Sequence, residues 1–200
     1  MSAELLKTLA RNFDQDAIAN LGQQIGAPQD KTHSAINAAL PVLVGMLAKN
    51  NQSQSGHESL ARAVEKDHDG SILDQLGGFL AQGETSMGEK ILGHVFGADK
   101  APAEAGLAKE TGLDSGQIGK MMALLAPVVM GALGQQARAS SGSTSGSIGD
   151  LLQGSMGDLL SGSSGRAGGN VLGELLGGRG GDLGGLAEVG SSILGSLFKK

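Results

Sequence analysis

Two apolar stretches decide the fold of this chain: AALPVLVGMLAKN at residues 38–50 and LAPVVMGALGQQ at residues 125–136. Each carries one proline, and one glycine four residues after that proline. A stretch that is apolar on every face, yet too short to cross a bilayer, predicts a helix buried in a protein core. Because proline removes one backbone hydrogen bond inside a helix, we expect each helix to be kinked or split there.

The two stretches belong to an internal repeat. When the chain is shifted by 86 residues against itself, identical residues coincide without a gap. The coinciding pairs include Gly26/Gly112, Pro41/Pro127, Val42/Val128, Gly45/Gly131 and Leu47/Leu133. The two copies cover about residues 25–50 and 111–136, which is too few repeats for a solenoid. The repeat therefore predicts a duplicated core with structural roles for both prolines, and with Gly45 and Gly131 letting another helix approach closely.

Shorter helices are expected in the rest of residues 1–137. Residues 3–24 have apolar side chains at helical spacing and predict one amphipathic helix. Further helices are predicted at 57–66, 71–82, 87–97 and 101–112. Since no stretch alternates as a β-strand does, the predicted fold class is all-α, a multi-helix orthogonal bundle.

Two residue pairs mark expected helix starts. Ser71 with Asp74, and Asp114 with Gln117, have the spacing of a capping box, in which the first side chain caps the helix. The first pair predicts a helix opened by Ser71. The second pair predicts that the proline-bearing helix of the second copy begins near Ser115.

The composition changes after Ala137. Residues 138–200 hold 18 glycines, many serines and short leucine-bearing units. These units are IGDLLQGS (148–155), MGDLLSGS (156–163), VLGELLGG (171–178) and ILGSLFKK (193–200). Glycine costs about 1 kcal/mol per helical position relative to alanine, so the units predict weak helices in a Gly/Ser/Leu-rich low-complexity tail. Whether this tail is ordered is left open.

Charge and composition exclude several classes of function. The net charge is −5, and residues 138–200 carry five basic and five acidic side chains. Neither half of the chain has the excess of basic residues that binding to a phosphate backbone requires, so we expect no nucleic-acid binding. The chain has no cysteine, no apparent signal peptide and no uninterrupted apolar run long enough for a membrane span. These features predict a cytoplasmic protein, although association with the cell envelope stays open.

Signatures of catalysis are missing from the sequence. It contains no G-x-S-x-G elbow, no Walker loop and no G-x-G-x-x-G, so we predict a protein that is not an enzyme and has no cofactor. Asp67, His68, Asp69 and His94 are weak candidates for metal ligands, because imidazole and carboxylate groups bind metals. Their spacing matches no zinc pattern, and Asp-His-Asp-Gly is also typical of a loop before a helix.

Several sequence motifs, in the order in which they occur, resemble those of a known family. These motifs are INAALPVLVGMLAKN, ILDQLGGFL, ILGHVFG and MMALLAPVVMGALGQQ. Over about residues 20–136 the chain resembles bacterial domain-of-unknown-function family 937, related to the YidB-like group. The resemblance implies a helical, multi-helix fold and a bacterial origin. It implies no activity and no catalytic residue.

Three functional hypotheses remain. The first is a non-catalytic helical module for self-association or protein interaction, with residues 138–200 forming a homo-oligomer or holding a protein partner. The second is a small-ligand or metal-dependent activity centred on His68 and His94. The third is a peripheral envelope-associated protein, attached through a C-terminal tail that ends in Lys199 and Lys200.

Overall fold

The computed structural model describes residues 3–67, 70–139 and 148–154, and the structural statements below concern these residues. Its elements are α1 (Ala3–Asn12), α2 (Gln15–Ile25), α3 (Gln29–Asn51), α4 (Gln54–Asp67), α5 (Ser71–Asp74), α6 (Leu76–Gln82), α7 (Ser86–Phe96), the 3-10 turn η1 (Gly97–Asp99), α8 (Lys100–Thr111) and α9 (Ser115–Ala139). A further helix covers 148–154. Throughout this described part the regular structure is helical, which confirms the predicted all-α class.

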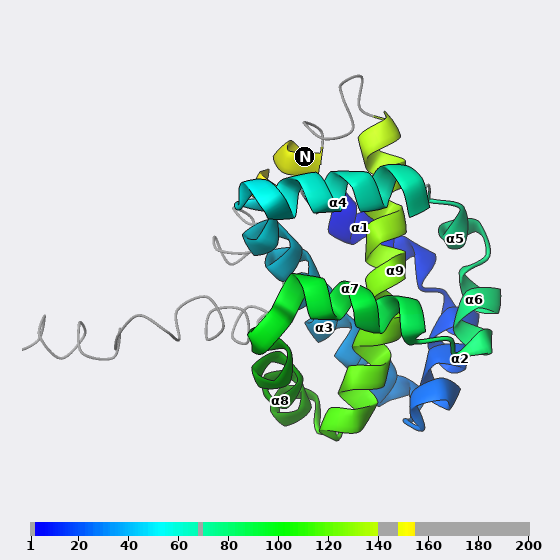
Figure 1. The fold of residues 1–200 in the computed structure, drawn as a ribbon. Coiled ribbons are helices and arrows are strands. Elements are labelled where there is room, and N and C mark those ends of the chain that lie inside the picture. The colour runs from blue at the N-terminus through cyan, green and yellow to red at the C-terminus, as the bar shows by residue number, and fades with distance from the viewer. Residues whose placement is uncertain (1–2, 68–69, 140–147, 155–200) are drawn as a thin grey trace, which may run out of the picture.

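The two apolar stretches form the centre of the fold. Residues 38–48 of α3 and 121–134 of α9 are buried without interruption. In Figure 1, α9 runs through the middle of the molecule, and α4 and α7 cross it. Leucine, alanine and methionine favour helices, and apolar side chains on all faces of a helix require neighbours all around it. The shorter helices supply these neighbours.

The prolines do not split their helices. Pro41 and Pro127 lie inside α3 and α9, and each helix is continuous across its proline. Of the two expected outcomes, a kink or a split, the split does not occur, and the kink stays a prediction. Proline removes a single helical hydrogen bond. The halves on both sides of it remain helical because they are buried against the same core.

Helix α7 meets α9 at the backbone carbonyl that Pro127 leaves without its helical donor. This carbonyl belongs to Ala123, four residues before the proline. Gly88 of α7 lies so close that a β-carbon on it would collide with the Ala123 oxygen. Glycine is therefore required at position 88 by the close approach of the two helices. Gly131 lies in a second close approach, where a β-carbon would meet Ile72 of α5.

The expected amino-terminal helix is two helices. The carboxylate of Asp14 accepts a hydrogen bond from the Ala17 amide at 2.8 Å and caps α2, so α1 ends before it. The prediction of a single helix over 3–24 is wrong because the apolar period continues through the break. Leu9 in α1 and Leu21 in α2 are both fully buried, and periodicity alone does not show such a cap.

The two expected capping boxes have opposite outcomes. Asp114 accepts from the Gln117 amide at 2.9 Å while the Gln117 side chain accepts from the Asp114 amide at 3.1 Å, which confirms the start of α9. Ser71, by contrast, is the first residue of α5 and not its cap. Gly70 holds the cap position with φ 94°, and the predicted helix 71–82 breaks at Gln75.

Each proline-bearing helix follows a similar local structure. Gly26 ends α2 and Gly112 ends α8, with φ values of 68° and 67° that favour glycine. The two glycines are partners in the 86-residue shift, and α3 and α9 follow them. The duplication itself and the orthogonal arrangement stay predictions.

Candidate interaction site

The first leucine-bearing unit of the tail packs on the helical body. Residues 148–154 form a helix in which Ile148 and Leu152 are 0% exposed and belong to the common core. The unit lies against the junction of α3 and α4: a β-carbon on Gly149 would lie 3.9 Å from both Asn51 and His57. The body therefore already accepts one short glycine- and leucine-bearing helix.

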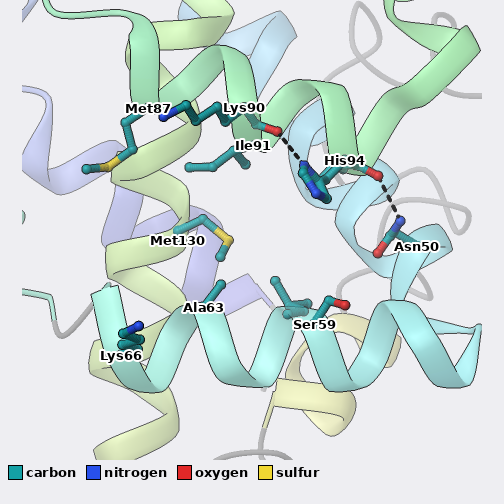
Figure 2. Close-up of a pocket in the computed structure, with 11 residues that line it drawn as sticks. Asn50, Ser59, Ala63, Lys66, Met87, Lys90, Ile91, His94 and Met130 are labelled. Atoms are coloured by element: carbon teal, nitrogen blue, oxygen red, sulfur yellow. Dashed lines mark hydrogen bonds between the residues drawn. The ribbon is translucent and has the colours of Figure 1, made fainter.

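A groove of about 700 Å³ lies between α4 and α7, with Met130 of α9 also lining it. Figure 2 shows Ser59, Ala63 and Lys66 along α4, facing Met87 and Ile91 on α7. The apolar lining residues are Leu60, Ala63, Met87, Ile91, Val95 and Met130. The volume is within the usual range for clefts that bind ligands.

The polar lining residues of the groove are mostly basic. Lys66 and Lys90 lie toward the end marked by Met87, while His94, Ser59 and Asn50 lie toward the other end (Figure 2). Among the described residues that line the groove, none is acidic. An apolar floor with cationic edges suits an apolar segment that carries a carboxylate.

Met87 is the most informative residue of the groove. Its side chain is 47% exposed, the one large hydrophobic residue that is exposed in the described chain. Methionine is flexible and polarisable, so it adapts to the shape of an apolar partner. Met87 therefore adds one exposed and adaptable apolar side chain to the lining of the groove.

His94 closes one end of the groove. Its Nδ1 lies 2.9 Å from the Lys90 carbonyl and donates a hydrogen bond to it in the tautomer that carries the proton on Nδ1. The Asn50 side chain donates to the His94 carbonyl at 3.2 Å and joins the end of α3 to α7 (Figure 2).

The loop before α7 holds one carboxylate with an altered pKa. Glu84 accepts a hydrogen bond from the Ser86 amide at 2.9 Å, at the start of α7. Hydrogen bonds from Ser86 hold the pKa of Glu84 below its ordinary value, because they stabilise the charged form. This carboxylate is fully exposed and does not line the groove.

The predicted metal ligands are only partly described by the structure. His68 and Asp69 lie outside the described residues, and Asp67 is placed only as the last residue of α4. His94 lies at the groove on α7. Within the ranges that the structure covers, no group of three or more His, Asp or Glu could hold a metal ion. A metal site using these residues stays a prediction.

The predicted structural residues lie in the buried centre. Pro41 and Gly45 are buried in α3, and Pro127 and Gly131 are buried in α9. Sequence reasoning did not find the groove, because its lining comes from four helices that are far apart in the sequence. The exposure of Met87 marks the groove in the structure, but the exposure of a side chain cannot be read from the sequence.

Helix α9 is also long and apolar enough to cross a membrane. Its most apolar window has a mean hydropathy of 1.4, and 78% of that window is buried inside the fold. A central helix of a folded core passes the same test of length and composition. In the described chain α9 is that central helix.

Comparison with known proteins places the helical body in a family. Residues 7–136 match the family described as bacterial protein of unknown function (DUF937). The chain belongs to this family. The DUF937 match ends before the tail, so the docked unit 148–154 lies outside it although its apolar side chains complete the core. No curated protein and no solved structure matches the chain significantly.

Proposed function

We propose that this DUF937 protein is a non-catalytic helical interaction module that self-associates through its tail, residues 138–200. One observation carries the proposal: the unit 148–154 is docked on the helical body with Ile148 and Leu152 fully buried. The body and this unit therefore have complementary surfaces, and the proposal extends this complementarity to the units that follow in the tail.

The tail repeats this complementary element. MGDLLSGS, VLGELLGG and ILGSLFKK follow the docked IGDLLQGS and share its spacing of glycine and leucine. A unit of this size cannot bury enough apolar surface to fold alone. The conformational entropy lost when its backbone is ordered exceeds the free energy gained from its few contacts. Docking on the body of another copy supplies the missing partner surface.

Light-scattering mass after gel filtration tests the proposal over a range of concentrations. The full chain 1–200 is compared with the truncated chain 1–155, which keeps the docked helix and so leaves the core covered. We expect masses above the monomer for the full chain, rising with concentration, and a monomer for 1–155. Circular dichroism checks that 1–155 remains folded.

A full-length control separates specific docking from the length of the tail. In it, Met156, Leu160, Leu172, Leu176, Leu194 and Phe198 are all replaced by serine. This variant keeps the tail but loses two apolar side chains from each of MGDLLSGS, VLGELLGG and ILGSLFKK, so we expect it to be a monomer. If the unaltered full chain is monomeric at every concentration, self-association is excluded.

A further inference from the structure

The docked unit belongs to a five-residue pattern that recurs in the described helices. The pattern is an apolar residue, glycine, any residue, then two apolar residues. It occurs at 44–48, 76–80, 92–96, 118–122 and 148–152. In each case the first and fifth side chains are buried, with exposed fractions of 5% or less. The third residue is exposed in all of them except 44–48, which is buried throughout α3.

Helix geometry explains this burial. Residues i and i+4 lie on one face of a helix, so the first and fifth positions pack together on the same neighbour. The third position lies on the far side, away from that neighbour. The pattern is therefore a packing unit, with two apolar anchors and one outward-facing residue.

The same five-residue sequence pattern occurs again in the tail beyond the described residues. It is found at 156–160, 172–176, 183–187 and 194–198. The third position of the pattern holds an acid in two of these, Asp158 and Glu174. Both match the basic edges of the groove between α4 and α7, where Lys66 and Lys90 have no acidic neighbour among the described lining residues.

Chain length favours the second of the two acidic units. The unit 156–160 starts two residues after the docked helix 148–154, which α4 separates from α7 in Figures 1 and 2. The unit 172–176 is preceded by the 17 residues 155–171, which are rich in glycine and serine. A Gly/Ser-rich coil of 17 residues spans roughly 23 Å on average. A span of that order separates the segment 172–176 from the docked helix, as docking on another molecule requires.

We propose that the groove between α4 and α7 is the docking site for the tail segment 172–176 of a second copy of this chain. The inference rests on the proposed self-association and names the two surfaces that meet. Leu172 and Leu176 pack on the apolar lining beside Met87 and Met130. Glu174 lies on the opposite side of the segment from these leucines, at the open side of the groove, where the long Lys66 and Lys90 side chains at its basic edges pair with it.

Fluorescence anisotropy with a labelled peptide of residues 168–180 tests this assignment. The acceptor is the full chain carrying Leu172→Ser and Leu176→Ser, so that its own segment does not compete. We expect saturable binding. Met87→Glu in the acceptor weakens binding about tenfold or more, because it removes an apolar contact and repels Glu174. Met87 is half exposed, so this change leaves the fold intact.

A charge exchange tests the orientation of the segment. Lys90→Glu in the acceptor weakens binding about fivefold, and the peptide with Glu174→Lys restores it, because the pair is again of opposite charge. Lys109→Glu, an exposed lysine of α8 outside the groove, is the matched control and leaves binding unchanged. Binding that is insensitive to both Met87→Glu and Lys90→Glu would overturn the assignment, as would no binding at millimolar peptide.

The outcomes separate this inference from the proposed function. If the full chain self-associates while the peptide does not bind in the groove, self-association stands and the assignment of 172–176 is wrong. If the peptide binds in the groove but the unaltered full chain is a monomer that no longer takes the peptide, the segment occupies its own groove. That result overturns both docking between copies and self-association.

Discussion

Single residues determine how closely the helices of this fold pack. Gly88 lies against the Ala123 carbonyl of α9. In the sequence alone, Gly88 is not distinguishable from the many other glycines of the chain. Gly93, five residues later on the same helix, has no atom near the position that a β-carbon would take. The two glycines therefore have different roles although both lie in α7.

We predict opposite effects on stability from the same substitution at these two glycines. Gly88→Ala forces α7 away from α9 and lowers the free energy of unfolding by about 3 kcal/mol. Gly93→Ala raises it by about 0.5–1 kcal/mol, because alanine restricts the unfolded chain and fits a helix. Urea denaturation measures both values, and equal effects at the two positions would contradict the proposed packing.

At the scale of elements, side-chain caps set where helices begin. Asp114 and Gln117 bind each other's backbone amides, and the Gln117 side chain also donates to the carbonyls of Ile25 and Gly26. The start of α9 is thus fixed locally by the capping box and tied to the end of α2 by a long-range contact. Only the capping box could be predicted from residue spacing, and the contact with the end of α2 could not.

We predict that removing this cap destabilises the whole fold. Asp114→Ala lowers the free energy of unfolding by about 1 kcal/mol, because the amide of Gln117 loses its acceptor. Ser115→Ala, at an exposed neighbouring position, is the control and is expected to change stability by less than about 0.5 kcal/mol. Chemical denaturation of both variants provides the comparison. An unchanged midpoint for Asp114→Ala would show that the cap is dispensable.

At the scale of the whole molecule, the boundary predicted at residue 137 does not coincide with the edge of the core. Ile148 and Leu152 belong to the common hydrophobic cluster, although they follow that boundary and lie outside the DUF937 match. The first tail unit thus acts as part of the body in the described structure. The composition of the tail, rich in glycine and serine, conceals this role.

We predict that the docked unit contributes to global stability. Leu152→Ala lowers the free energy of unfolding by about 2–5 kcal/mol, the usual cost of deleting a fully buried leucine side chain. Gln153→Ala, at the exposed next position, is the matched control with little expected change. Thermal unfolding of the full chain measures both. Equal melting temperatures for Leu152→Ala and the unaltered protein would show that this helix does not stabilise the core.

The sequence by itself determined the all-α class, the two buried central helices and the capped start of α9. These features depend on local periodicity, residue propensity and fixed spacing, which act within a few turns of chain. The tertiary structure alone decided the need for glycine at 88, the docking of 148–154 and the groove beside Met87. Each of these depends on contacts between residues far apart in the sequence, and periodicity carries no information on which distant surface a side chain will meet.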